Sequence, residues 1–237
     1  MSTPSALCLT FDDNFVDSWH QAAPLFEKYG ARVTFFLCWP ERITPKQRDL
    51  LMSLQDMGHE IGFHTRSHVR LPKYLQTHSL EDYVSDQIDD GLDWMHKLGL
   101  SPRSFSFPYF RFRPKLIEPL LERFDILRLE GPYDEYQDSL SPRWGNRTVN
   151  TYCFTDKTGM ELSNAYFADR FEWLRQHGGV GVTCGHFIGA TGNKFARMRC
   201  TEDDLEGILA LARAYDFEFT TMSELAAPQP KGQQQAA

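Results

Sequence analysis

Seven short apolar runs, separated by segments with helical periodicity, restrict what this chain can fold into. The runs are rich in β-branched and aromatic residues and span residues 6–11, 33–38, 59–63, 104–107, 124–129, 180–184 and 217–220. Segments with helical spacing occupy residues 19–29, 45–57, 80–98, 114–123, 164–177 and 201–215. Strands that alternate with helices are typical of βα units around a parallel sheet. The periodicity therefore predicts a parallel α/β fold.

The length of the chain agrees with one domain. With 237 residues, of which 41% are hydrophobic, the chain can bury a large core, and α/β barrels reach this size as single units. We expect one domain over residues 1–225. Residues 226–237 contain three consecutive glutamines and two prolines, so we expect a disordered tail there.

Several predicted helices carry recognisable ends. Thr44 precedes a proline suited to the first helical turn, and Thr201 precedes three acidic residues that favour the positive end of a helix dipole. Gly30, Gly58 and Gly99 follow the first three helical segments, where glycine commonly ends a helix. These positions indicate where the helices begin and end.

Residues 131–153 interrupt the alternation. The segment is rich in tyrosine, aspartate, proline and arginine, so we expect a long loop or a short hairpin. Loops of this length in compact domains often belong to a binding site, but a solvated excursion explains the same composition. Both interpretations stay open at this point.

The charge of the chain limits its partners. A formal net charge of −7 argues against nucleic acid or an anionic membrane surface, since both favour a basic face, and it fits a neutral or cationic small substrate better. No run of 18 apolar residues would cross a membrane, and residues 1–5 lack the basic and apolar regions of a signal peptide. We therefore expect a cytoplasmic protein with no membrane span.

The five cysteines, at positions 8, 38, 153, 184 and 200, do not suggest a disulfide framework. Their number is odd and no pair has C-x-x-C spacing, so we expect most of them to be small buried hydrophobic residues. An alternative pairs Cys184 as a nucleophile with His186 as its base, but no third group that would orient the histidine is evident. Cysteine catalysis is thus the less favoured interpretation.

Acidic and histidine side chains follow two of the predicted strands. Asp12 and Asp13 close the first apolar run, and His64 and His68 follow the third. Two imidazoles and one carboxylate bind a catalytic zinc ion and leave a fourth position open for water. Taken alone, a histidine pair at this spacing is often accidental, and an acidic pair often caps the next helix. The combination is more informative than either part.

Two further segments end at predicted strands. Pro108 and Tyr109 follow the fourth run, and His186 follows the sixth. Because the carboxyl ends of parallel strands form one face of an α/β barrel, we expect all of these side chains to meet there. His59 begins the third run and has no partner motif, so we expect a structural role for it within the strand.

These segments, in this order, resemble the motifs of the polysaccharide deacetylase family, the NodB-like carbohydrate esterases. Residues 10–14 are similar to T-F-D-D-G, and residues 58–68 to G-H-E-I-G-x-H-T-x-S-H. Pro108-Tyr109 corresponds to part of R-x-P-[Y/F]-G, and residues 184–186 to L-x-H. The resemblance extends over residues 7–225. It implies the family's fold, a distorted, incomplete (β/α)7 barrel.

The resemblance also implies roles for individual residues. Asp13, His64 and His68 would bind zinc or another divalent transition metal, Asp12 would be the general base, and His186 would be the general acid. The activity implied is zinc-dependent removal of the N-acetyl group from an amino sugar, either in an oligo- or polysaccharide or in a glycan precursor.

We expect the remaining site residues to surround the reacting carbonyl. Tyr109 would offer a backbone N–H to the oxyanion, and Pro108 and Arg111 would lie beside the substrate.

The chain departs from the family pattern at four positions. These are Asn14 and Phe110, where glycine is usual, Ser106, where arginine is usual, and Cys184, where leucine is usual. The arginine missing at Ser106 helps to hold the catalytic base in relatives. We hypothesise that Arg111, just beyond the motif, supplies this charge to Asp12; the alternative is a solvated or structural arginine.

Two other functions remain as alternatives. One is hydrolysis of another small amide or ureide, as in the allantoinase-like branch of the superfamily. The other is a catalytically silent carbohydrate-binding relative that kept the fold. Retention of a base, three metal ligands and an acid favours catalysis, and retention of both histidines counts against a metal-free branch.

Overall fold

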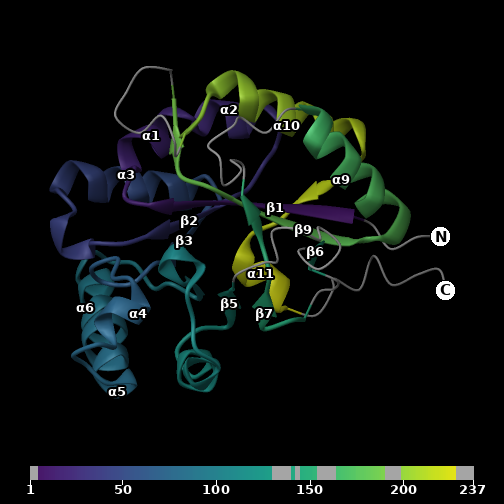
Figure 1. Ribbon diagram of the computed structural model, residues 1–237. Helices are drawn as coiled ribbons and strands as arrows, with labels where there is room; N and C mark the ends of the chain where they lie inside the picture. The colour runs from purple at the N-terminus through teal and green to yellow at the C-terminus, as the bar shows by residue number, and fades with distance from the viewer. Residues whose placement is uncertain (1–4, 130–139, 142–144, 154–163, 190–198, 228–237) are drawn as a thin grey trace.

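The protein is described by a computed structural model, which covers residues 5–129, 140–141, 145–153, 164–189 and 199–227 (Figure 1). Within these residues a ten-stranded, almost entirely parallel sheet curls into a barrel that stays incomplete at one seam. The strands follow the order β6-β9-β1-β2-β3-β4-β5-β7, with β8 beside β9 and β12 beside β1. This is the distorted, incomplete (β/α)7 barrel of a single domain, as the sequence predicts.

The strands of this sheet are β1 (Ser5–Asp13), β2 (Thr34–Leu37), β3 (Glu60–Phe63), β4 (Ser104–Ser106), β5 (Ile126–Arg128), β6 (Leu140–Ser141), β7 (Thr148–Val149), β8 (Tyr152–Cys153), β9 (Gly179–Gly185) and β12 (Glu218–Phe219). A separate two-stranded sheet pairs β10 (Phe187–Ile188) with β11 (Arg199–Cys200).

The helices pack around the outside of the sheet, and the group formed by α4, α5 and α6 lies at the lower left of Figure 1. They are α1 (Val16–Gln21), α2 (Ala23–Lys28), α3 (Pro45–Asp56), α4 (Leu71–Tyr74), α5 (Leu80–Tyr83), α6 (Asp90–Lys97), α7 (Ile117–Leu121), α9 (Asn164–His177), α10 (Glu202–Ala214) and α11 (Met222–Ala226). Short 3-10 helices are η1 (Pro40–Arg42), η3 (Pro108–Phe110) and η4 (Pro114–Leu116), and η2 (Val84–Asp89) is a π-helix.

Strand β1 forms the centre of the fold. All nine of its residues are buried, as expected for a strand of a parallel sheet that is covered on both faces. It pairs with β9 over seven positions, from Ser5 to Phe11, and with β2 over its last four, from Thr10 to Asp13. The carboxyl end of β1 therefore lies between two neighbouring strands, and a side chain there is surrounded by protein.

The described residues of the segment 131–153 form short strands that pair with the main sheet, whereas the sequence predicts a long loop or a short hairpin. Although residues 130–139 and 142–144 lie outside the described residues, β7 pairs with β5 and β8 pairs with β9. Short strands from this segment thus occupy the space between the two ends of the sheet. These strands form because they pair with neighbouring strands, and burial contributes little. Val149 and Thr151 are the only buried side chains among residues 145–151.

Two predicted helices are divided in the structure. Residues 19–29 form α1 and α2, because Pro24 at the start of α2 cannot continue the hydrogen bonds of α1. Residues 80–98 form α5, the π-helix η2 and α6. Within α6, Gly91 lies so close to the Phe63 ring that a Cβ atom would collide with it. The close approach brings η2 against the loop that follows β3.

The predicted helix ends are confirmed. Thr44 and Thr201 each form a capping box with the residue three positions on. Gly30, Gly58 and Gly99 adopt φ values of +57°, +89° and +83° directly after their helices. Helix α11 ends at Ala226, so the first residue of the expected tail is helical, while residues 228–237 lie outside the described residues.

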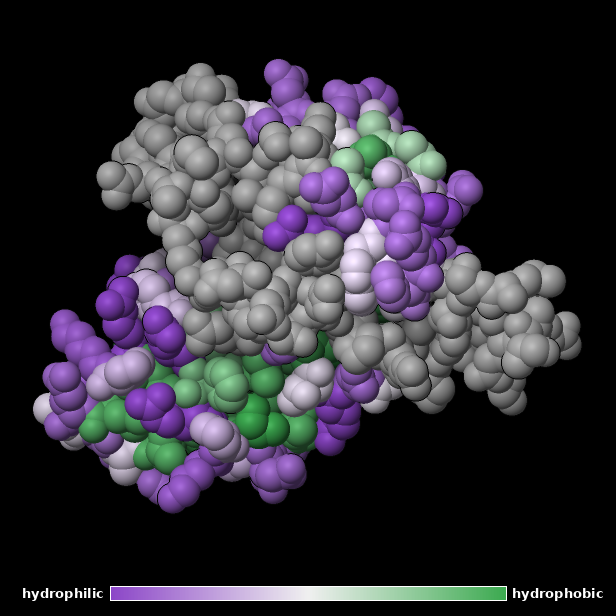
Figure 2. Space-filling model, turned by 45° about the vertical axis from the view of Figure 1, so that its right-hand side comes forward, coloured by the Kyte–Doolittle hydropathy of each residue, from purple (hydrophilic) through white to green (hydrophobic). Residues whose placement is uncertain are grey.

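The described surface exposes few large hydrophobic side chains. Figure 2 shows one face, where hydrophilic residues cover much of the described surface and a hydrophobic area lies at the lower left. Met57, Trp94 and Tyr109 are the only large hydrophobic residues in the described part of the chain that are classed as exposed, and Tyr109 is 46% exposed. None of the described helices has the length and apolar character needed to cross a membrane.

Candidate active site

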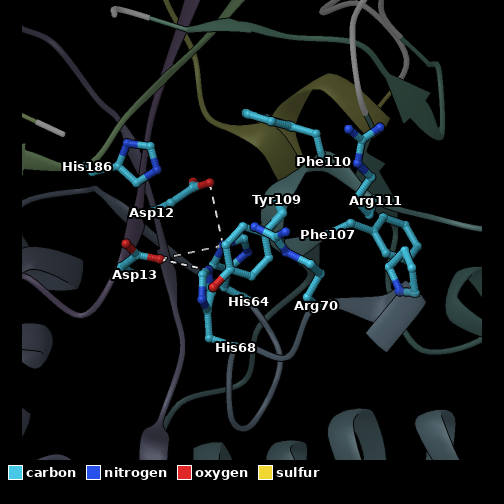
Figure 3. A pocket seen from close by; sticks show the side chains of 11 residues that line it. Asp12, Asp13, His64, His68, Arg70, Phe107, Tyr109, Phe110, Arg111 and His186 are labelled. Carbon is cyan, nitrogen blue, oxygen red and sulfur yellow. Dashed lines mark ion pairs between the residues drawn. The ribbon is translucent and has the colours of Figure 1, made fainter. Parts of the chain in front are cut away.

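Asp12 and Asp13 enter one pocket from the end of β1. Side chains of successive strand residues normally point to opposite faces. Asp13 adopts a φ of +83°, which interrupts the extended backbone, and both carboxylates line the same pocket (Figure 3). Asn14, which stands where the family has glycine, does not adopt a positive φ. The unusual backbone conformation falls on Asp13 instead.

The loop after β3 brings His64 and His68 to the same pocket. Thr65 and His68 have φ values of +68° and +52°, and the Thr65 hydroxyl accepts a hydrogen bond of 3.1 Å from the His68 N–H. Gln87 of η2 holds the loop from outside: its Oε1 accepts hydrogen bonds from the Ser67 N–H and hydroxyl, at 3.1 and 2.8 Å. Backbone strain of this kind concentrates at functional sites.

Asp13, His64 and His68 have the geometry of a metal-binding set. One possible ligand atom from each lies within 4.8 Å of the others. Asp13 Oδ1 lies 3.0 Å from His68 Nε2 and 3.9 Å from His64 Nε2. The same oxygen is buried and has no hydrogen-bond partner with acceptable geometry among the described residues. A cation would satisfy this otherwise uncompensated atom.

His64 is prepared to act as a ligand. Its Nδ1 lies 2.8 Å from the backbone oxygen of Ser106, which fixes the proton on Nδ1 and leaves the lone pair of Nε2 directed at the two aspartates. Burial lowers the pKa of His64 to about 4, so the imidazole is neutral at pH 7. Two imidazole nitrogens and a carboxylate fit zinc and related divalent ions.

Arg128 holds Asp12, and this corrects the hypothesis that Arg111 does so. The Arg128 guanidinium meets both carboxylate oxygens of Asp12, with 2.8 Å between Nη1 and Oδ1. Both side chains are buried. Burial alone would raise the pKa of Asp12, but the charge and hydrogen bonds of Arg128, together with the nearby His64 and His186, outweigh burial and keep that pKa well below its usual range. Figure 3 draws Arg111 away from Asp12, near Phe110.

The sequence-based expectation missed Arg128 because it lies outside the motifs. Ser106 and Arg128 are register partners on β4 and β5, and the Ser106 hydroxyl accepts a hydrogen bond of 2.6 Å from the guanidinium. The rings of Phe36 and Phe110 lie 4.9 and 5.5 Å from Arg128 Cζ. An arginine inside an otherwise apolar strand run is the signal that could have revealed it, since a buried cation requires a partner.

His186 and Cys184 complete the other side of Asp12. Ligand atoms of these three residues lie within 4.8 Å of one another, and the Cys184 thiol donates to Asp12 Oδ2 at 3.5 Å. The Trp19 indole donates to the backbone oxygen of His186 at 2.9 Å. A thiol that donates its hydrogen bond to a carboxylate gives no support to Cys184 as a nucleophile.

Three other cysteines fit the sequence-based expectation of buried positions. Cys8, Cys38 and Cys200 are buried, and like Cys184 they are free. His59 is also buried, and its Nδ1 accepts a hydrogen bond of 3.2 Å from the Val33 N–H. Its ring packs on Phe26 and Phe35, as a structural histidine would.

The pocket has a volume of about 520 Å³, and the turn after β4 forms one of its walls. Tyr109 and Phe110 line this wall with φ values of +57° and +54°, and Arg111 follows them. The glycine usual at position 110 would adopt this conformation without strain. Pro108 begins the turn but is buried and does not line the pocket.

Comparison with known proteins agrees with this geometry. The chain matches the polysaccharide deacetylase family over residues 2–121, just over half of its length. No curated protein sequence matches it. Its fold is similar to a family 4 carbohydrate esterase from Streptomyces lividans in complex with acetate, with 14% identity, a TM-score of 0.63, and coverage of 97% of this chain and 100% of that one.

Two further solved structures have the same fold. The chitin deacetylase of the fungal pathogen Colletotrichum lindemuthianum has 16% identity and a TM-score of 0.63, covering 97% of this chain and 90% of its own. Peptidoglycan deacetylase PdaC from Bacillus subtilis has 19% identity and a TM-score of 0.60, covering 94% and 90%. The family match and the shared fold together show that this chain belongs to the polysaccharide deacetylase family.

Proposed function

We propose that the protein is a metal-dependent hydrolase that removes the N-acetyl group from an amino sugar in an oligosaccharide, a polysaccharide or a glycan precursor. The observation that carries the proposal is that one pocket contains two separate sets of side chains, one suited to bind a metal ion and one suited to transfer protons. Asp13, His64 and His68 form a metal-binding set, while Asp12 is held separately by Arg128 and faces His186.

Asp13, His64 and His68 would hold the metal, with zinc as the ion that best suits two imidazole nitrogens and a carboxylate. A divalent cation bound there lowers the pKa of a water molecule and polarises the carbonyl of an acetamide. The hydrogen bond from His64 Nδ1 to Ser106 keeps the ligand nitrogen oriented, and Gln87 keeps the His68 loop in place.

Asp12 would take the proton from the attacking water. Because Arg128 stabilises its ionised form, the carboxylate is available as an acceptor at neutral pH.

His186 would protonate the departing amine. An amine leaves poorly until it is protonated, so amide hydrolysis needs an acid on the leaving-group side. Water adds to the carbonyl carbon, the C–N bond breaks, and acetate and the free amino sugar are formed. Tyr109 lines the pocket beside His68, with 4.7 Å between the ring centroids, and its backbone N–H would stabilise the oxyanion.

The proposal is tested by acetate release from N-acetylated sugars, with allantoin included as a ureide. Metal-loaded protein should release acetate, and Asp12→Asn should retain metal while turnover falls roughly 10²-fold or more. Asp17→Asn is the matched control, because Asp17 pairs with Lys46 at the surface and does not line the pocket. Sugar binding without acetate release would instead identify a silent relative, and full turnover by Asp12→Asn would refute its role as base.

A further inference from the structure

The catalytic pocket continues into a second groove. This groove has a volume of about 660 Å³ and shares His68, Arg70 and Tyr109 with the catalytic pocket. It extends over α4 and adds Lys73 and Tyr74 to its lining. A substrate whose acetamide lies beside His68 therefore has a direct path into the groove.

Arg70 stands at the junction of the two spaces. Its Cζ lies 4.7 Å from the centre of the Tyr109 ring, and the His68 ring also contacts Tyr109, with 4.7 Å between the ring centroids. Figure 3 shows Arg70 and Tyr109 together beside the two histidines. A guanidinium stacked on an aromatic ring keeps its N–H edge free, and this edge binds a carboxylate or a phosphate with two parallel hydrogen bonds.

The groove carries positive charge that the described residues do not neutralise. Arg70 and Lys73 are both exposed, and neither forms an ion pair with a carboxylate in the described part of the chain. The groove lining contains no aspartate or glutamate. Tyr74, which lines the groove, donates a hydrogen bond of 2.6 Å from its hydroxyl to the carboxylate of Asp86, which does not line the groove.

Many other basic side chains on the described surface are paired. Lys28 contacts Glu206, Arg66 contacts Asp90 at 3.1 Å, and Arg123 contacts Asp89 at 2.5 Å. In a chain with a net charge of −7, Arg70 and Lys73 give the area beside the catalytic pocket a local positive charge that no described carboxylate neutralises. A ligand responds to the field of the cleft it enters, not to the net charge of the whole molecule.

We propose that the substrate is an N-acetyl amino sugar that also carries an anionic group, a carboxylate or a phosphate ester, and that Arg70 and Lys73 bind this group. The inference rests on the proposed deacetylation and narrows its substrate class. It also replaces the expectation of a neutral or cationic substrate, which was drawn from net charge alone. The reaction itself is unchanged: water and the acetamide give acetate and the free amine, and the anionic group stays on the sugar.

The test compares anionic and neutral sugars with metal-loaded protein. The anionic substrates are N-acetylglucosamine 1-phosphate, N-acetylglucosamine 6-phosphate and N-acetylmuramic acid, which carries a carboxylate. The neutral substrates are N-acetylglucosamine and its β-1,4-linked dimer and tetramer. At least one anionic sugar should exceed the neutral sugars in kcat/KM by about tenfold or more, the scale of a charge-assisted hydrogen bond. The phosphate and carboxylate arms identify which anion is bound.

Variants identify the groups responsible. Arg70→Gln and Lys73→Gln should each lower the ratio of anionic to neutral kcat/KM, mainly through KM, and added salt should lower it in the parent. Arg70→Lys should retain part of the ratio. Lys97→Gln is the matched control, because Lys97 lies over the Trp94 ring on α6 and outside the groove.

Two results would overturn the inference: neutral sugars that react as well as the anionic ones, or a ratio that Arg70→Gln and Lys73→Gln leave unchanged. If no sugar releases acetate, the proposed function fails, and calorimetric affinities for the same sugars decide the anionic preference by themselves. Equal affinities for anionic and neutral sugars would then reject it.

Discussion

The ion pair between Arg128 and Asp12 is closed to solvent, so breaking it from the arginine side has a cost that can be worked out. The two side chains are 0% and 4% exposed, and the guanidinium contacts both carboxylate oxygens. Arg128→Met retains an unbranched side chain that can pack on Phe36 but removes the charge. Asp12 is then left as a buried carboxylate without its cation.

The magnitude follows from the desolvation of that carboxylate. Removing one partner of a buried ion pair costs about 3–5 kcal/mol, because the other charge stays buried without compensation. A domain of this kind is stable by only about 5–15 kcal/mol, so the loss is a large part of the total. In the double variant Asp12→Asn/Arg128→Met no lone charge remains. We expect it to be more stable than Arg128→Met by about 2 kcal/mol or more.

Urea unfolding of metal-free protein at pH 7 measures these differences. The matched control is Arg123→Met, since Arg123 forms a partly exposed pair with Asp89 that should contribute about 1 kcal/mol or less. If Arg128→Met costs no more than Arg123→Met, or if the double variant is no more stable than Arg128→Met, then the buried pair does not stabilise the site as argued.

Three further predictions concern the site and its support. The parent should hold roughly one divalent ion per chain by elemental analysis, and His64→Ala and His68→Ala should each abolish its binding. The control His96→Ala, at an exposed position, should keep the ion. An ion retained in both site variants would contradict the ligand set. Gln87→Leu removes the acceptor that holds the His68 loop, so metal affinity should fall about 10- to 100-fold in competition with a chelating dye, and an unchanged affinity would show that the loop holds itself. Burial lowers the pKa of His59 from 6.5 to about 4, so the unfolded chain binds a proton at this side chain at a higher pH than the folded chain does. The stability that depends on neutral His59 is therefore complete above pH 6.5 and is lost as the pH falls towards 4. His59→Asn should therefore reduce the fall in unfolding free energy between pH 7 and pH 4, by up to roughly 3 kcal/mol, and a slope equal to the parent's would argue against this.

The barrel could be predicted because its main strands are recognisable by themselves. The buried run of β1 and the alternation of strands and helices both appear in the sequence. The short strands β7 and β8 do not, since each contains two residues and exists through pairing with β5 or β9. Strand formation at such positions depends on the neighbours rather than on local propensity.

The meeting of Asp12, Asp13, His64 and His186 in one pocket follows from parallel topology, in which strand ends share one face. The electrostatic partners follow from something else. Arg128 reaches Asp12 because β5 lies beside β4, and Arg70 reaches the pocket because α4 begins next to the His68 loop. Neither contact follows from a recognisable spacing in the sequence. Strand pairing places Arg128, and loop geometry places Arg70.

The register of β4 and β5 suggests how this chain retains a cation at Asp12 without the arginine usual at position 106. Ser106 and Arg128 face each other across the two strands, and both side chains are completely buried or nearly so. A small residue at one position makes room for a long one at the other, so the two positions should be energetically coupled.

Ser106→Arg alone would place two guanidinium groups in one buried space, and Arg128→Ser alone would leave Asp12 unpaired. The double variant Ser106→Arg/Arg128→Ser restores one cation and one small residue while the Ser106 backbone oxygen that binds His64 is kept. In urea unfolding, we expect the double variant to lose about 1–3 kcal/mol less unfolding free energy than the two single variants lose together. It should also recover the turnover that Arg128→Ser loses. If the losses of unfolding free energy in the two single variants simply add in the double variant, the two positions are not coupled. The surrounding core would then require the cation at position 128 and would not accept it at position 106.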